Sequence, residues 1–192
     1  MMWGNNPGTG GTATLIPQNS VGAELGVWMG DSSEKFLRNA AHVHLVDSWS
    51  PAPYAETDEW GSYENYLERY SALAGGNTTE DFQRFYDKVY QSVVDRFAGR
   101  PVTIHRMTTD EWFSTFTEKL DWIYIDASHA YEACLRDLRN ASSVLKPNGI
   151  IFGDDYSDKK PGVKKAVDTF ISETGLEMNN FYMDQYIIQL KG

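Results

Sequence analysis

Three aspartates follow two apolar segments that each have the length of a buried strand. Asp126 follows residues 122–125, and Asp154 and Asp155 follow residues 149–153. In an open parallel α/β sheet the carboxyl ends of neighbouring strands face the same crevice, so acids at two such ends can converge on one cation. The pattern predicts a metal site. The alternative is that Asp154 and Asp155 form an ordinary turn and helix cap, because aspartate is common in loops.

A second candidate site follows the first predicted strand. Glu24 lies in that strand, and Gly26 and Gly30 let the chain turn tightly where a ligand could approach the backbone. Asp47 ends the next strand and is placed to accept hydrogen bonds from ribose hydroxyls. Together these features predict a nucleoside-binding site. The alternative is a plain strand-to-helix turn beside a solvated acid.

The spacing of this turn favours one cofactor over another. The sequence reads Glu-x-Gly-x-x-x-Gly rather than Gly-x-Gly-x-x-Gly, and Asp31 at the start of the next helix would repel a pyrophosphate. Glu24 could instead receive the amino group of a zwitterionic sulfonium cofactor. S-adenosylmethionine therefore fits better than NAD. A nicotinamide-dependent Rossmann oxidoreductase and a non-catalytic S-adenosylmethionine-binding module both stay open.

The elements that position these residues alternate between strands and helices. Strands are predicted at residues 21–26, 42–47, 101–105, 121–126, 149–153, 176–182 and 185–190. Helices are predicted at residues 31–41, 61–73, 80–97 and 131–145, and a further helix from Pro161. This alternation predicts a single α/β domain over residues 1–192, a Rossmann-like three-layer sandwich. Its seven-stranded sheet would be mostly parallel, with an antiparallel C-terminal strand.

Two segments depart from the alternation. Residues 1–20 are rich in Gly, Asn and Thr, which predicts a loop or flexible arm. Residues 50–99 form a helical, aromatic-rich insertion that could be a lid over the crevice or an interface between copies of the chain. The alternative is that its aromatic side chains only pack its two helices together.

Asp31 and Glu34 are spaced as a capping box for the helix that follows Gly30.

The amino-acid composition restricts the kinds of partner that we expect the protein to bind. The chain has 192 residues and a formal charge of -10, which disfavours nucleic acid because binding it depends on clustered Lys and Arg. The single cysteine, Cys134, excludes an internal disulfide. We expect a cytoplasmic protein without a signal peptide and without a membrane span, since no apolar stretch approaches the roughly 20 residues that a span needs.

Several motifs resemble those of a known family. Residues 24–30, followed by residues 45–49, resemble the first two motifs of class I S-adenosylmethionine-dependent methyltransferases. Residues 125–132, with 145–149 and 153–156, are similar to the metal-dependent macrocin-type sugar O-methyltransferases. The resemblance covers residues 21–170. Ala127 and Asn148 depart from it, because the family often has glycine there.

The resemblance implies roles for individual residues. The cofactor would contact Glu24, Gly26, Gly30, Ser32, Asp47, Ser48, Trp49, Met107, Thr108 and Asp126. Asp126, Asp154 and Asp155 would hold one divalent cation, and hard oxygen ligands favour Mg2+ or Mn2+ over zinc. The reaction would methylate a hydroxyl of a small molecule, such as a sugar or polyol.

His129 is the candidate general base. It follows Asp126 by three residues, and an unperturbed histidine pKa of about 6.5 suits proton removal. Asp126 is the second candidate, and a purely structural histidine is the alternative. His42 and His44 share one face of the second strand, but the sequence offers nothing else to complete a zinc set with them. The lysines at 159, 160, 164 and 165 are expected to form a solvated helix face.

Overall fold

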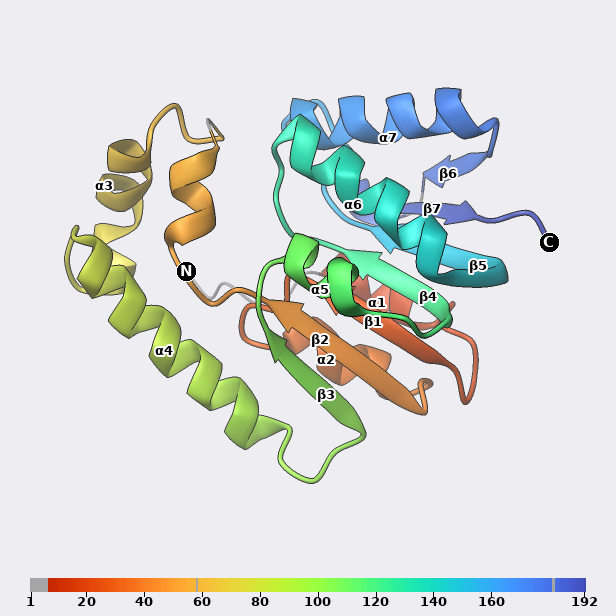
Figure 1. Cartoon of the computed structure of the whole chain (residues 1–192), viewed down its shortest axis with the longest axis horizontal. Helices are drawn as coiled ribbons and strands as arrows, with labels where there is room; N and C mark the ends of the chain where they lie inside the picture. Colours follow the sequence, from red (N-terminus) through yellow and green to blue (C-terminus); the bar gives the residue numbers. More distant parts are fainter. Residues whose placement is uncertain (1–6, 58, 181) are drawn as a thin grey trace.

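A seven-stranded sheet forms the centre of the computed structural model, which describes residues 7–57, 59–180 and 182–192 (Figure 1). The strands are β1 (Val21–Leu25), β2 (His42–Asp47), β3 (Val102–Arg106), β4 (Leu120–Ile125), β5 (Leu145–Gly153), β6 (Met178–Asn180) and β7 (Tyr186–Gln189). Their order is β3-β2-β1-β4-β5-β7-β6. Strands β1 to β5 pair in parallel, whereas β7 is antiparallel to both β5 and β6. The predicted Rossmann-like fold is confirmed.

Helices cover both faces of this sheet (Figure 1). They are α1 (Pro7–Ala13), α2 (Asp31–Phe36), α3 (Tyr63–Ala74), α4 (Thr79–Arg96), α5 (Thr109–Thr115), α6 (Tyr131–Val144) and α7 (Pro161–Thr174), with 3-10 turns η1 (Ala52–Glu56) and η2 (Tyr182–Asp184). Successive strand residues face opposite sides, so Ile123 and Ile125 pack with α6 and α7. Trp122 and Tyr124 pack instead against Phe36 of α2. Each face of β4 is therefore buried. Among the described residues, no helix is long and apolar enough to cross a membrane.

The N-terminal segment is a helix where the sequence predicted a flexible arm. Helix α1 contains three glycines and has poor helix propensity. Thr9 and Thr12 are nonetheless fully buried, and the Thr12 hydroxyl donates a hydrogen bond to Gln185 at 2.5 Å. Tertiary contacts thus stabilise α1, so the prediction of a loop was wrong for residues 7–13, whereas residues 14–20 form turns and loop as predicted. Residues 1–6 of the predicted arm lie outside the described residues.

The predicted capping box before α2 is also wrong. Gly30 is the N-cap, with φ 81°, and no side chain caps the helix. Asp31 and Glu34 instead form ion pairs with Arg96 and Arg100, at 2.7 Å and 3.0 Å. The acids therefore join α2 to the end of α4 rather than to their own helix start.

The 50–99 segment is helical, as its pattern predicted, and comprises η1, α3 and α4. Figure 1 shows α3 and α4 on the side to which the parallel strands point. Inside it the Tyr66 and Tyr86 hydroxyls lie 2.7 Å apart, and the Tyr54 ring stacks on Tyr66. Trp28, from the loop after β1, packs against Tyr86. The insertion thus packs against the loop that the sequence assigns to the cofactor.

Candidate active site

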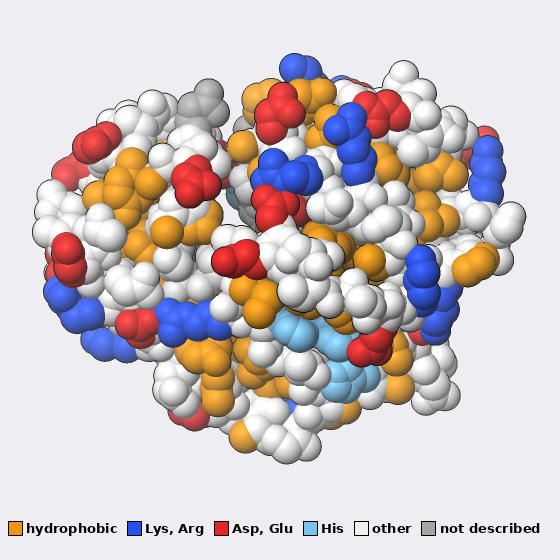
Figure 2. All heavy atoms as spheres, viewed as in Figure 1, with side chains coloured by type: hydrophobic (Ala, Val, Ile, Leu, Met, Phe, Trp, Pro, Cys, Tyr) orange, Lys and Arg blue, Asp and Glu red, His pale blue; other side chains and the backbone are white. Residues whose placement is uncertain are grey.

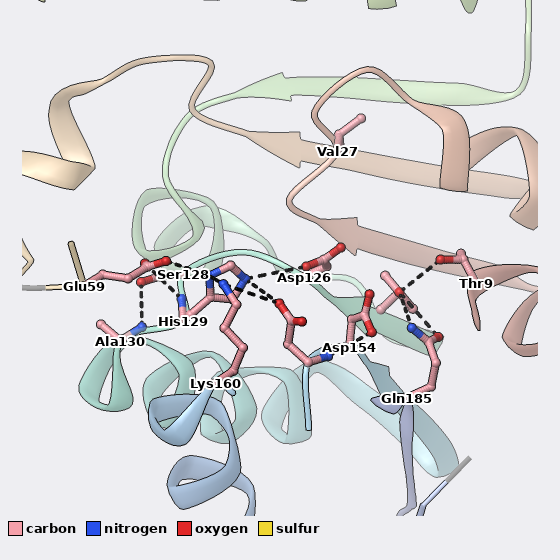
Figure 3. A network of polar contacts seen from close by, with 12 residues as sticks. Thr9, Val27, Glu59, Asp126, Ser128, His129, Ala130, Asp154, Lys160 and Gln185 are labelled. Atoms are coloured by element: carbon pink, nitrogen blue, oxygen red, sulfur yellow. Dashed lines mark hydrogen bonds and ion pairs between the residues drawn. The ribbon is translucent and has the colours of Figure 1, made fainter. Parts of the chain in front are cut away.

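Asp126, His129 and Asp155 lie together at the carboxyl ends of β4 and β5 (Figure 3). The pairing of Ile125 with Gly153 brings the two strand ends side by side. Nε2 of His129 lies 2.9 Å from Oδ2 of Asp155 and 3.9 Å from Oδ1 of Asp126. One oxygen or nitrogen from each of the three side chains lies within 4.8 Å of the others. The three side chains could therefore hold one metal ion.

Asp154 lies beside this cluster but is not part of it. Its side chain is mostly buried, and Oδ1 accepts a hydrogen bond from the backbone N–H of Asp155 at 2.8 Å. Burial raises the pKa of Asp154 to about 7, and the nearby charge of Asp126 adds to the rise. Asp155 has a left-handed backbone with φ 64°, and its side chain contacts His129. Of the three predicted metal ligands, the structure thus brings together two.

Glu59 is a site residue that the sequence analysis missed. It belongs to the insertion, and Oε1 lies 2.6 Å from Nδ1 of His129. Its other oxygen accepts a hydrogen bond from the backbone N–H of His129 at 3.3 Å. Figure 3 shows the His129 ring between Glu59 on one side and the strand-end aspartates on the other. Nothing in the local sequence pattern distinguishes Glu59 from an ordinary acid in a loop.

Lys160 also reaches His129, whereas the sequence predicted a solvated lysine. Its Nζ lies 2.8 Å from Nδ1 of His129 and 3.8 Å from Oδ2 of Asp155. Gly162 allows this approach, because a Cβ there would lie 2.2 Å from the backbone oxygen of His129. Nδ1 cannot donate to Glu59 and accept from Lys160 at once. We assign the donation to Glu59, because a charged ring then donates from Nδ1 to Glu59 and from Nε2 to Asp155, the two carboxylates within hydrogen-bond distance.

This environment favours the charged form of His129. Burial acts to lower the pKa of the imidazole, but its contacts with Asp126, Asp155 and Glu59 outweigh burial and raise the pKa to about 11. The ring therefore holds a proton at neutral pH while the carboxylates are uncompensated. A role as base requires that their charge be offset.

The loop after β1 approaches the same strand ends. Gly26 has φ 86°, and a Cβ there would lie 1.8 Å from the backbone oxygen of Asp126. Glycine is therefore required where β1 and β4 end. Glu24 is buried, and its carboxyl accepts a hydrogen bond from Ser33 of α2. Burial raises the pKa of Glu24 well above its ordinary value.

Asp47 holds the same loop in place. Oδ2 accepts hydrogen bonds from the backbone N–H groups of Val27 and Trp28, both at 3.0 Å, and Oδ1 accepts one from Trp49 at 2.8 Å. The carboxylate therefore fixes the glycine loop against the end of β2. Oδ1 keeps room to accept a further hydrogen bond, so the predicted contact with ribose is compatible with this role.

The other predicted cofactor residues occupy the surrounding loops. The Trp49 ring is buried, and its N–H donates to the backbone oxygen of Trp28 at 2.9 Å. Thr108 caps α5 in a capping box with Glu111. The backbone N–H of Met107 donates to the backbone oxygen of Asp47 at 3.0 Å. Ser32 donates a long hydrogen bond to Thr9, at 3.4 Å, and Ser48 is partly buried. Trp49 and Thr108 thus have structural partners of their own.

Comparison with known proteins identifies the class. A sequence profile for the family described as "Methyltransferase domain" matches residues 23–156, which is more than half of the chain. The chain therefore belongs to this family and is a class I S-adenosylmethionine-dependent methyltransferase. The match spans the glycine loop, Asp47, and the Asp126, His129 and Asp155 cluster. This family assignment decides against the alternative of a nicotinamide-dependent oxidoreductase. No curated protein sequence matches the chain.

Solved structures share the fold at low identity. Precorrin-6y C5,15-methyltransferase from Geobacter metallireducens has a TM-score of 0.62 and 12% identity, over 95% of this chain and 88% of that chain. A protein from Staphylococcus aureus, provisionally named caffeoyl-CoA O-methyltransferase, has a TM-score of 0.61 and 18% identity, over 98% and 84%. The O-methyltransferase NovP has a TM-score of 0.55 and 21% identity, over 94% and 75%. Because these names differ in the group that is methylated, the fold alone does not identify the acceptor.

Proposed function

We propose that this methyltransferase transfers the methyl group of S-adenosylmethionine to a hydroxyl oxygen of a small molecule, such as a sugar or polyol, with a divalent cation, Mg2+ or Mn2+. The observation that carries the proposal is the cluster of Asp126, His129 and Asp155 beside the glycine loop. Oxygen-rich clusters suit hard cations, and vicinal hydroxyls are suited to the same ions.

The residues present fit a cation. Two carboxylates converge, and a third, Asp154, is close enough to Asp126 for that charge to raise its pKa. Ionised carboxylates that lie close together repel one another, so a bound positive charge stabilises this arrangement. Asp126 and Asp155 would hold the ion, with Asp154 as the further predicted ligand. When bound, the cation would offset these charges and, as a Lewis acid, lower the pKa of a substrate hydroxyl.

His129 then has a defined role in the transfer. Nδ1 stays with Glu59, which orients the ring and stabilises its charged form. Nε2 faces the two aspartates and, once their charge is offset, takes the proton of the acceptor hydroxyl. The hydroxyl oxygen forms a bond to the methyl carbon as the bond from that carbon to sulfur breaks. Alignment of the reacting atoms supplies much of the rate, since the reaction is a direct displacement.

The first two strands would bind the donor. The donor would lie along the loop between Gly26 and Gly30, which Asp47 holds in place, and Glu24 and Asp47 would accept hydrogen bonds from its polar groups. The insertion carries Glu59 to the site, which supports a lid that excludes water from the reaction. The formal charge of -10 supports a small acceptor rather than a nucleic acid.

A methyl-transfer assay tests the proposal. The purified protein is incubated with S-adenosylmethionine and a panel of sugars, polyols, phenols, amines and carbon acceptors, with Mg2+ or with EDTA, and products are detected by mass spectrometry. We expect one class of hydroxyl compound to gain a methyl group in the presence of Mg2+ only. Methylation of nitrogen or carbon acceptors, or undiminished activity in EDTA, would contradict it. Cofactor binding without transfer to any acceptor would favour the non-catalytic module.

A further inference from the structure

Three histidines gather on one face of the sheet, away from the active site. His42 and His44 are two residues apart on β2 and therefore face the same side. His105 lies on β3, where His44 pairs with Thr103 and Val46 pairs with His105, so His105 is a diagonal neighbour of His44. Figure 2 shows the histidine side chains as one patch at the surface over these strands. The sequence offered no partner for His42 and His44, but the parallel pairing supplies one.

The imidazoles are in direct contact. Nδ1 of His44 lies 3.1 Å from Nε2 of His105, and the two rings stack at 5.3 Å between centroids. The His42 ring lies 5.1 Å from that of His44. His44 is buried, whereas His42 and His105 are partly exposed and remain accessible from solvent.

The spacing of the first two nitrogens is close to that of neighbouring ligands on one ion. Zinc binds histidine nitrogen at about 2.0–2.1 Å in tetrahedral sites, which places adjacent ligand nitrogens about 3.3 Å apart. The same 3.1 Å distance suits a hydrogen bond between His44 and His105 while no ion is bound. His42 contacts the Thr103 hydroxyl at 3.0 Å, so its ring would have to leave that contact and rotate to bring a third nitrogen to the pair.

The surroundings also resemble those of a metal site. The centroid of the Phe116 ring lies 5.0 Å from that of His44. The centroid of the Trp112 ring lies 6.4 Å from that of His44 and 6.0 Å from that of His105. An apolar shell of this kind limits solvent access and strengthens ligand bonds. In the strand order β1 stands between these strands and the β4–β5 pair that carries the aspartates. The cluster is therefore separate from the site of methyl transfer.

We propose that His42, His44 and His105 bind a borderline divalent transition-metal ion, of the class of Zn2+, Cu2+ and Ni2+. Imidazole ligands select these ions, whereas the carboxylates at the strand ends select Mg2+ or Mn2+. The chain thus carries two metal sites of different chemistry. The histidine site is independent of the proposed reaction and does not require it.

Calorimetric titration with Zn2+, in excess Mg2+ to occupy the carboxylate site, tests the proposal. We expect one Zn2+ per chain at micromolar affinity. His42→Gln and His105→Gln each weaken that affinity at least ten-fold, and thermal unfolding confirms that both variants fold. The control Thr103→Val binds Zn2+ at least as tightly as the parent. Asp155→Asn, which removes the other cluster, leaves Zn2+ affinity unchanged.

Copper gives an independent optical readout. Bound Cu2+ quenches nearby tryptophan, so we expect fluorescence loss from Trp112 that disappears in the His42→Gln, His105→Gln double variant. Absence of Zn2+ binding tighter than millimolar in the parent protein would overturn the proposal. Equal affinity in the double variant, or loss of Zn2+ binding in Asp155→Asn, would also overturn it.

Discussion

The carboxylate of Glu59 lies 2.6 Å from Nδ1 of His129 and ties the helical insertion to the end of β4. The two residues are 70 positions apart in the sequence. Glu59 also accepts the backbone N–H of His129, so it fixes both the ring and the turn that carries it. The insertion therefore contributes a side chain to the proposed active site and does more than pack against the domain.

Glu59→Gln tests that relationship. Glutamine keeps the size of the side chain but removes the charge that stabilises protonated His129. We expect kcat to fall about 10- to 100-fold with little change in KM for S-adenosylmethionine, in line with other residues that orient a functional histidine. Glu56→Gln, at an exposed acid of the same insertion, is the matched control. Equal kcat in both variants would show that Glu59 only packs.

His129→Ala tests the proposed base. We expect binding of S-adenosylhomocysteine, measured by calorimetry, to change less than about three-fold, because the ring contacts the aspartates and Glu59 rather than the glycine loop. Turnover should fall by about 100- to 10,000-fold, the usual contribution of a general base. Undiminished turnover would remove His129 from the mechanism and leave Asp126 as the candidate.

Asp155→Asn tests the cation. Asn tolerates the left-handed backbone at this position, so the change removes charge without adding strain. We expect Mg2+ affinity to fall at least ten-fold by calorimetry, while S-adenosylhomocysteine binds as before. Asp158→Asn, at an exposed acid in the same loop, serves as the control and should bind Mg2+ like the parent protein. Parental Mg2+ affinity in Asp155→Asn would place the ion elsewhere.

Asp137 gives stability a pH dependence. Burial raises its pKa to about 7, and its Oδ1 has no hydrogen-bond partner among the described residues. In the unfolded chain the Asp137 carboxyl ionises at about pH 4. Between about pH 4 and pH 7 the folded state therefore keeps a proton on Asp137 that the unfolded state has lost, so the free energy of unfolding falls as pH rises over this range. Asp137→Asn cannot ionise. Its stability relative to the parent should rise by about 1–4 kcal/mol over that range in urea unfolding. A pH-independent difference would contradict the shift.

Gly26→Ala tests the contact between the ends of β1 and β4. Both Gly26 and Gly75 have a left-handed backbone, but a Cβ at Gly75 meets no atom within 4 Å, whereas at Gly26 it meets the Asp126 oxygen. We expect Gly75→Ala to cost about 1–2 kcal/mol of unfolding free energy and Gly26→Ala about 2–5 kcal/mol. Similar costs would mean that the strand ends can separate freely.

The sequence predicted most of the sheet because its strands are short apolar runs between turn residues. The strand predicted at residues 42–47 agrees with β2 at both ends, and those before Asp126 and Asp154 end within a residue of their predicted limits. Helix α1 could not be found in this way, since its glycines disfavour a helix and tertiary contacts, such as those of the buried Thr9 and Thr12, stabilise it. Helix α5 was missed although Thr108 and Glu111 carry the spacing of a capping box.

In the candidate site, too, the residues near strand ends could be predicted from the sequence, whereas the residues that reach the site from distant loops could not. Asp126 and Asp155 were predictable because they follow strands whose carboxyl ends meet at one edge of the sheet, and His129 was predictable because it follows Asp126 by three residues. Glu59 and Lys160 reach His129 from distant loops, and no periodic pattern marks such contacts. The raised pKa of His129 depends on Asp126, Asp155 and Glu59 together, so it could not be deduced from residue type.

A crystal structure with S-adenosylhomocysteine and Mn2+ tests the central claim most directly, because anomalous scattering locates the metal. We expect a manganese peak bounded by Asp126 and Asp155, with the cofactor along the loop from Gly26 to Gly30 and its sulfur directed toward the ion. A peak away from those aspartates, or a cofactor that leaves the glycine loop without contacts, would contradict the account.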